Sequence, residues 1–540
     1  MQSSTFNFIN EKYEGEEGKI SFGVLKHLNL FMPNEQIEYF ADIDGAYFDK
    51  MNVIVEFAND NNEILISDIH NITLSSDNKI RILGRFSAAK NGVYIVNLSF
   101  DKTDIKLSFK IGIVPKTEIA NDNFYFGTQA YYCNSLKNAD WNVAGQDFED
   151  SMESVISTAE WLGCNLLRED GVSWYLSQPS EKEKIDLSLM DKCLNNITER
   201  GMKLMWIIGG STDWALNDKY AEAGKGRGWQ YPPKKEYWDT RIKAIAEQYK
   251  GNKNIIYEIW NEADWEFFMG TEEEYFELLD SACEIIKGID NNAFVIPSAL
   301  VSSWETSHNP QIFAKNSMKY FAKYKELLQK GLIDTLNIHD HSLFKEEGMF
   351  ASRDRRNNRL ERAGYENEVT GIMVTEAGIW SADDEEQAIG LMNKILWYRA
   401  NGFGSYVAYS FRTERNAPKK NLTWELFSSK LQPRRSAIAY ASLIGMLGQC
   451  DYIEKIGPAT DTCFADIYFD GEKSVVPLFA REDGNKKLAV NTSLPYTVYD
   501  IYGNIIENNK DNIYSALPRV IYLVFDGKVS SADFKWDSLQ

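Results

Sequence analysis

The middle of this chain alternates short apolar runs with longer amphipathic stretches, and this alternation constrains the fold more than any other feature. Successive runs start 32 to 52 residues apart. They begin near Phe124, Cys164, Lys203, Ile255, Ala293, Thr335, Ile372 and Gly404. A short apolar run suits a buried parallel strand, and a longer amphipathic stretch suits a helix. Eight strand–helix units over about 300 residues predict an α/β fold, the (β/α)8 barrel.

The stretch that begins at Thr271 illustrates the helical half of this unit. Thr271 is expected to cap a helix, with the carboxylate of Glu274 at the third helical position. The alternative architecture, an open doubly wound sheet, would carry a glycine-rich phosphate turn after its first strand. The segment 126–131 is not such a turn. The barrel is therefore the preferred interpretation.

Short alternating strands flank the barrel on both sides. Before it, runs such as 52–57 and 93–100 are separated by turns rich in Asn, Asp and Gly, as in an immunoglobulin-like β-sandwich. After a helix-like segment at 435–448, short strands return at 463–469 and 474–480. The predicted parts are an N-terminal β-sandwich at 1–120, the barrel at 121–448 and a small C-terminal β module at 449–540.

The charge balance narrows the range of partners. The 540 residues include 58 basic and 79 acidic side chains, which gives a net charge of 58 − 79 = −21. A surface this acidic argues against nucleic acid or an anionic membrane as the partner. No run of about 18 apolar residues exists, so membrane insertion is not expected. No sequence pattern specifies an oligomeric state.

The first residues lack the basic start and apolar stretch of a secretory signal. We therefore expect a cytoplasmic protein, or a secreted or periplasmic one whose signal has been removed. Six cysteines are spread along the chain without a CxxC pair, so buried thiols are expected rather than a zinc site or disulfides. They are Cys133, Cys164, Cys193, Cys283, Cys450 and Cys463.

Two carboxylates stand where a barrel keeps its chemistry, at the carboxyl ends of its strands. The fourth apolar run ends in Asn261-Glu262, and the seventh delivers Glu376 into a turn of small residues. Two such carboxylates can converge across the mouth of the barrel. A retaining glycosidase needs this arrangement, because one carboxyl attacks the anomeric carbon while the other, about 5–5.5 Å away, protonates the leaving oxygen.

At these residues the sequence resembles clan A of the glycoside hydrolases, which carries Asn-Glu at the end of strand 4 and Glu at the end of strand 7. Within the clan it looks most like family 39 (β-xylosidases, α-L-iduronidases and related endoglycosidases) or a neighbouring family. The resemblance implies that Glu262 is the acid/base and Glu376 the nucleophile. It also implies that Asn261 holds the hydroxyl next to the anomeric carbon.

Arg168 ends strand 2, where the resemblance implies a cation that supports the nucleophile. A positive charge within about 4–6 Å would keep Glu376 ionised. The alternative is that Arg168 only pairs with Glu258, which alternation places on the same strand face as Glu262.

Strands 6 and 8 follow the clan pattern only in part. His339 fits the histidine of strand 6, whereas His341 stands where a tyrosine usually donates to the nucleophile; an imidazole can also donate. Strand 8 lacks the usual tryptophan floor, and Tyr409 is the expected substitute. No cofactor or metal is expected. His339, Asp340 and His341 resemble a ligand cluster, but no fitting third partner appears at metal spacing.

Several tryptophans near strand ends could stack on sugars, with Trp174, Trp214 and Trp380 as the chosen candidates, although at least half of the set is expected to pack in the core. The set is Trp174, Trp206, Trp214, Trp260, Trp265 and Trp380. The arginine-rich stretch 353–362 suits the solvated face of a helix. Arg412, at a strand end, is the better candidate for contact with an acidic sugar.

The function predicted from these residues is retaining hydrolysis of glycosidic bonds in an oligosaccharide or polysaccharide. Two alternatives remain open at this point. One is a non-catalytic carbohydrate-binding protein on a degenerate barrel, and the other is a transglycosylase, which the same residues would serve. The sugar, its linkage and the choice between exo and endo cleavage are not specified by any of these motifs.

Overall fold

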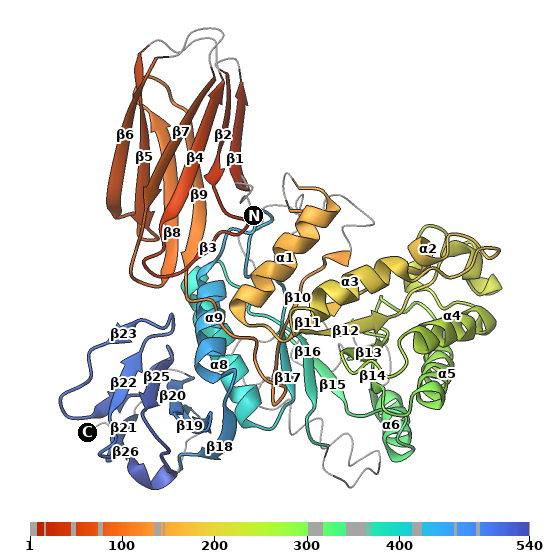
Figure 1. Cartoon of the computed structure of the whole chain (residues 1–540). Coiled ribbons are helices and arrows are strands. Elements are labelled where there is room, and N and C mark those ends of the chain that lie inside the picture. The colour runs from red at the N-terminus through yellow and green to blue at the C-terminus, as the bar shows by residue number, and fades with distance from the viewer. Residues whose placement is uncertain are drawn as a thin grey trace.

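The computed structural model describes residues 8–538 with several gaps, and nothing below concerns the residues in those gaps. They are 16–17, 45–49, 74–78, 134–141, 144–145, 301–316, 342–363, 365–366, 368, 413–423, 458–461 and 482–485. The arginine-rich stretch 353–362 lies outside the described residues. A strand–helix barrel occupies one side of the molecule, and β-sheets from the two ends of the chain lie on its other side (Figure 1).

Eight parallel strands form the barrel, and each begins within two residues of its predicted start. They are β10 (Tyr125–Gln129), β11 (Leu166–Glu169), β12 (Lys203–Ile208), β13 (Ile255–Ile259), β14 (Phe294–Pro297), β15 (Asn337–Asp340), β16 (Met373–Ala377) and β17 (Ser405–Ala408). Their order is β14-β13-β12-β11-β10-β17-β16-β15, a nearly closed ring. The predicted (β/α)8 barrel is confirmed.

Helices follow the strands and cover the outside of the barrel (Figure 1). They are α1 (Phe148–Leu162), α3 (Ser188–Thr198), α4 (Lys235–Gln248), α5 (Glu272–Ile289), α6 (Ser317–Gln329), α8 (Asp384–Ala400) and α9 (Arg435–Leu447), with a short α2 (Trp174–Ser177) after β11. The expected cap at Thr271 is present as a capping box with Glu274. Among the described residues, no helix is both long and apolar enough to cross a membrane.

The inside of the barrel is layered. Six strands each place one apolar side chain in a shared lower layer, which consists of Leu166, Met205, Ile256, Ile296, Met373 and Val407. Two residues further along each strand, the same face bears the next layer. In that upper layer Arg168 lies above Leu166, and Glu258 lies above Ile256. Polar groups are therefore raised to the mouth of the barrel on a packed apolar floor.

Two sheets before the barrel pack face to face, as expected for a β-sandwich. The first contains β1 (Phe8–Gly15), β2 (Gly18–Val24), β4 (Ile37–Asp44) and β7 (Lys79–Phe86). The second contains β3 (Leu30–Phe31), β9 (Lys106–Ile113), β8 (Gly92–Phe100), β5 (Met51–Asn59) and β6 (Ile64–Ile72). Rings from both sheets meet between them; Phe22 lies edge-on to Phe109 and Tyr39 stacks on Phe86, which stacks on Phe57.

Two further sheets follow the barrel. One contains β18 (Asp451–Lys455), β19 (Cys463–Phe469), β20 (Ser474–Ala480), β25 (Ile521–Phe525), β22 (Tyr496–Tyr499) and β23 (Ile505–Ile506). The other contains β24 (Ile513–Ser515), β21 (Lys486–Val490) and β26 (Phe534–Ser538). The side chains of Asn91 and Asn504 tie these sheets to the N-terminal sandwich through reciprocal backbone hydrogen bonds. All six cysteines are free and buried, as predicted.

Candidate active site

Glu262 and Glu376 meet at the mouth of the barrel. Glu262 follows β13, and Glu376 lies in β16, three strands further around the ring. One carboxylate oxygen from each lies within 4.8 Å of the other and of a ring nitrogen of His339. Both glutamates are buried, at 5% and 9% exposure. The two carboxylates singled out in the sequence are therefore brought together by the fold.

The backbone at this end of the barrel is strained. Three residues other than glycine adopt positive φ at strand ends: Tyr131 at 55°, Trp260 at 74° and Glu262 at 43°. Side chains with a Cβ rarely occupy this region, and such strain clusters at functional sites. In β16 the register against both neighbouring strands shifts around Glu376, which marks a local bulge. Both glutamates thus depart from regular strand geometry.

Arg168 connects the site to the polar layer beneath it. Its guanidinium donates to Glu258 at 2.7 and 3.1 Å and to Glu376 Oε2 at 2.8 Å. It also donates to Gln129 Oε1 and Asn261 Oδ1, both at 2.7 Å. Arg168 therefore does not pair with Glu258 alone, because the same guanidinium also holds Glu376.

His339 lies between Arg168 and Glu262. Arg168 Nη2 can only donate, and it faces His339 Nε2 at 3.4 Å. In the neutral ring the other nitrogen then carries the proton, so Nδ1 donates to Glu262 Oε1 at 2.7 Å. Burial lowers the pKa of His339 to about 4, which keeps this ring neutral at neutral pH.

The surroundings push the pKa values of the two glutamates apart. Burial, together with the negative charge of Glu376, raises the pKa of Glu262 well above its usual range. Burial also acts to raise the pKa of Glu376, but positive neighbours outweigh it and lower that pKa to about 2. The positive charge of protonated His339 is the largest contribution that lowers the pKa of Glu376, but this ring is neutral at pH 7. The contributions that remain at pH 7 are the charge of the Arg168 guanidinium and the hydrogen bond from His341. The surroundings thus favour a protonated Glu262 beside an ionised Glu376.

An aromatic wall lines the Glu376 side of the site. His341 Nε2 lies 3.2 Å from Glu376 Oε1, so the imidazole can donate where a tyrosine was expected. The His341 ring is 5.2 Å from the rings of both Tyr409 and Trp424. Trp424 also lies 5.0 Å from Tyr409 and 5.4 Å from Trp380, whose side chain is 46% exposed. We use "aromatic wall" for Tyr409, Trp424 and Trp380.

Trp424 was not anticipated from the sequence. It follows β17 by sixteen residues, in no periodic pattern, so nothing in the sequence linked it to the strand that lacks a tryptophan. Tyr131 was also missed; its ring lies edge-on to Tyr409 at 6.2 Å. Its position two residues after the first barrel strand was the signal that could have identified it.

Two of the three tryptophans expected to stack on sugars pack against other side chains. Trp174 is 2% exposed and packs in the core, with the Arg241 guanidinium 4.8 Å from its ring centre. Trp214 is half-buried against Trp174 and Tyr237, and its Nε1 donates to the Gln178 carbonyl at 3.2 Å. Trp174 corrects the expectation, because a ring this deeply buried offers no free face to a sugar, whereas Trp214 is half-buried. Trp380 alone of the three is exposed.

Arg412 requires a similar correction. It is 1% exposed, and burial lowers its pKa to about 10 while the negative charge of Glu169 at the end of β11 opposes that effect. Its guanidinium is thus buried inside the protein rather than placed for the expected contact with an acidic sugar.

The other side of β15 holds the two histidines in place. Alternation along the strand points His339 and His341 into the barrel and Asp340 outward. There Lys394 of α8 donates to the Asp340 carbonyl at 2.8 Å and lies 3.1 Å from its carboxylate, which also accepts from the Tyr398 hydroxyl at 2.5 Å. Lys394 is fully buried and Asp340 is 3% exposed. This buried ion pair anchors β15 behind the site.

Replacing Lys394 with methionine is expected to lower the free energy of unfolding by about 3–5 kcal/mol, because Asp340 would keep a buried charge without its cation. Urea denaturation of both proteins measures the difference. Lys330→Met is the control, since Lys330 pairs with Glu326 at the surface and should change stability by less than about 1 kcal/mol. Equal effects of the two substitutions would contradict the assigned role.

Glu262, His339 and Glu376 also have the spacing of metal ligands. The structure therefore corrects the expectation that His339 lacks further ligands nearby. However, the Arg168 guanidinium already contacts Glu376 Oε2 at 2.8 Å and would repel a cation bound there. The donor set suits a pair of carboxylates with opposite protonation better than a metal centre.

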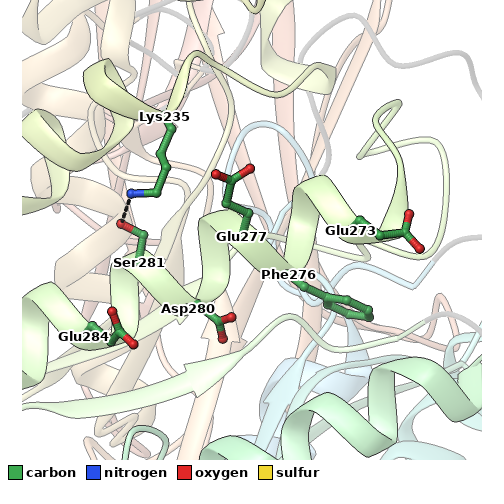
Figure 2. Close-up of a pocket in the computed structure, with 7 residues that line it drawn as sticks. All are labelled: Lys235, Glu273, Phe276, Glu277, Asp280, Ser281 and Glu284. Carbon is green, nitrogen blue, oxygen red and sulfur yellow. Dashed lines mark hydrogen bonds between the residues drawn. The ribbon is translucent and has the colours of Figure 1, made fainter.

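A pocket of about 490 Å³ lies elsewhere, on the outer surface of the barrel. Lys235 of α4 and six residues of α5 line it, four of them acidic (Figure 2). Lys235 Nζ donates to Ser281 Oγ at 3.2 Å across it. None of the residues at the mouth of the barrel contributes to this pocket.

Comparison with known proteins supports the barrel fold. Residues 126–362 match the family model described as cellulase (glycosyl hydrolase family 5). No curated protein matches the sequence significantly. A solved family 39 glycoside hydrolase from the gut symbiont Bacteroides cellulosilyticus has a TM-score of 0.62 and 14% identity, over 93% of this chain and 99% of that one. A glucosidase from Croceicoccus marinus has a TM-score of 0.51 and 12% identity, over 77% and 98%.

The family match identifies residues 126–362 as a glycoside hydrolase domain of clan A, and the eight-stranded barrel agrees with that class. The expected resemblance to that clan is confirmed. Within the clan, the matched model is that of family 5, and the fold of the whole chain is similar to that of a family 39 enzyme.

Proposed function

We propose that this enzyme hydrolyses glycosidic bonds of an oligosaccharide or polysaccharide with retention of anomeric configuration, with Glu376 as nucleophile and Glu262 as acid/base. The observation that carries the proposal is the pair itself. The two carboxylates have oxygens within 4.8 Å of each other, and their pKa values are shifted in opposite directions. Two neighbouring carboxyls with separated pKa values can divide the roles of acid and nucleophile.

The separation supports retention rather than inversion. In retaining enzymes the two carboxyl groups are about 5–5.5 Å apart, whereas inverting enzymes leave about 6.5–9.5 Å for a water molecule. Oxygens of Glu262 and Glu376 that lie within 4.8 Å of each other are closer than the spacing with which inverting enzymes admit a water beside the sugar. This spacing supports attack on the sugar by the carboxylate itself.

In the first step the Glu376 carboxylate attacks the anomeric carbon while Glu262 gives its proton to the departing oxygen. Arg168 and His341 each contact one oxygen of Glu376, which orients the carboxylate and keeps it ionised. Once Glu262 has lost its proton, the Nδ1–H of His339 stabilises the new negative charge through the 2.7 Å hydrogen bond.

In the second step Glu262 removes a proton from water, and the hydroxide attacks the anomeric carbon of the glycosyl-enzyme. The bond to Glu376 breaks, and its carboxylate returns to Arg168 and His341. Asn261 is proposed to hold the neighbouring sugar hydroxyl, since its Oδ1 is oriented by Arg168 Nη2 at 2.7 Å. The exposed ring of Trp380 is proposed to contact the sugar on the nucleophile side.

The experiment that tests this function is reducing-end release from a broad panel of glycans and nitrophenyl glycosides, followed by proton NMR of the first product. The newly formed sugar is expected to have the anomeric configuration of the substrate, because two displacements restore it. Formation of the opposite anomer would contradict the mechanism. Binding without product would favour a carbohydrate-binding protein, and transfer to an added acceptor sugar in place of hydrolysis would favour a transglycosylase.

A further inference from the structure

We propose that Trp265, Phe267 and Trp229 form a platform for sugar units on the leaving-group side of the cleaved bond. We call these three residues the aglycone strip. The inference rests on the proposed function and extends it, because it makes the substrate a chain that continues beyond the bond being cut.

The strip starts at Glu262. Trp265 follows Glu262 by three residues, and its backbone N–H donates to the Glu262 carbonyl at 2.9 Å. The Trp265 ring lies edge-on to Phe267 at 5.4 Å, and Phe267 lies 6.0 Å from Trp229. The rings therefore form a continuous row from the turn that begins at Glu262 to a different loop.

The outer end of the strip faces solvent. The Trp229 side chain is 52% exposed, and the adjacent Met269 is 43% exposed. Exposed apolar surface beside a functional site commonly marks a binding groove. Indole and phenyl rings offer flat faces that match the apolar faces of sugars. A sugar chain that leaves the mouth of the barrel on this side would cover these rings.

Hydrogen bonds hold the two loops of the strip together. Met269 N donates to the Gln230 carbonyl at 2.7 Å, and the Gln230 side chain donates to the Glu266 carbonyl at 3.1 Å. Trp260 Nε1 donates to the Phe267 carbonyl at 2.8 Å. Because these bonds flank Trp229 and Phe267, the platform is built before a ligand arrives, which lowers the entropic cost of binding.

The position of the aglycone strip in the barrel assigns it to the leaving-group side of the cleaved bond. The strip belongs to the loops after β12 and β13, whereas the aromatic wall follows β16 and β17 across the ring (Figure 1). Glu262 protonates the leaving oxygen, so the departing part of the substrate lies on its side. A chain that crosses the mouth from the wall to the strip passes over both glutamates.

Trp229→Ala is expected to lower kcat/KM for cellotetraose and xylotetraose roughly tenfold, the effect of one lost aromatic contact. The loss should be several-fold smaller on β-glucosyl and β-xylosyl fluoride, because their leaving group is a single atom that cannot reach the strip. Trp229→Phe keeps a ring and should recover most of the tetraose activity. Tyr452→Ala, which removes a 39% exposed ring outside the barrel, is the control and should change neither activity.

Equal losses on tetraoses and fluorides, or no loss on either, would overturn the inference and leave the proposed function intact. Wild-type enzyme that hydrolyses a fluoride but neither tetraose would also overturn it. Failure of the wild type on every glycan and fluoride would instead contradict the proposed function, and the inference would fail with it.

Discussion

Glu376→Ala is expected to lower kcat by about 10⁴-fold or more on every substrate, because no other group can form the covalent intermediate. Glu376 is the carboxylate with the lowered pKa, and it is held by Arg168 and His341. The measurement is steady-state hydrolysis of the best substrate from the glycan panel. Circular dichroism and a thermal melt of the variant establish that it is folded.

A matched carboxylate supplies the control for Glu376. Glu277 is exposed on α5, and Glu277→Ala should retain full activity (Figure 2). Azide, which is small enough to enter the space left by the side chain, should partly restore turnover of Glu376→Ala by direct attack and yield a glycosyl azide of inverted configuration. Substantial hydrolysis by Glu376→Ala without azide would end the assignment of Glu376 as nucleophile.

Glu262→Ala is expected to lower kcat/KM about 10²–10⁴-fold for substrates with poor leaving groups, the usual contribution of a general acid. Substrates with very good leaving groups should still form the glycosyl-enzyme, since their departure needs no proton. Water attack then becomes slow, so a rapid burst of nitrophenol should precede slow turnover. Stopped-flow absorbance measures both phases.

The pH profile gives an independent test of the same residue. Wild-type activity requires Glu376 ionised and Glu262 protonated, so kcat/KM should fall as the pH drops toward about 2 and fall again as the pH rises through the raised pKa of Glu262. Glu262→Ala should lose the alkaline limb and keep the acidic one. Persistence of the alkaline limb in the variant would mean that another group is the acid.

The barrel was predictable because its signal is local and repeated. A strand buried on both faces reads as a short apolar run, and each of the eight runs sits within two residues of a strand in the structure. Glu262 and Glu376 were predictable for the same reason. Packing does not favour a carboxylate at the carboxyl end of a buried strand, so each of these glutamates differs clearly from the apolar residues before it.

The residues that contact those carboxylates were harder to predict from the sequence. The pairing of Arg168 with both Glu258 and Glu376 depends on strands that lie 90 and 208 residues away. Trp424 joins the wall from a loop with no periodic pattern, and Trp229 meets Phe267 only because two loops are hydrogen-bonded together. Side chains in loops follow no periodic pattern. Their direction is set by tertiary contacts that no sequence pattern predicts.

Burial reversed two expectations for the same reason. Trp174 and Arg412 stand near strand ends in the sequence, yet both are packed inside the structure. The barrel and the two carboxylates at its strand ends could be predicted from the amino-acid sequence, because hydrophobic periodicity is a local property of the chain. The opposite pKa shifts of the two carboxyls and the exposure of each ring could not, because charge, burial and contact depend on groups that meet only after folding.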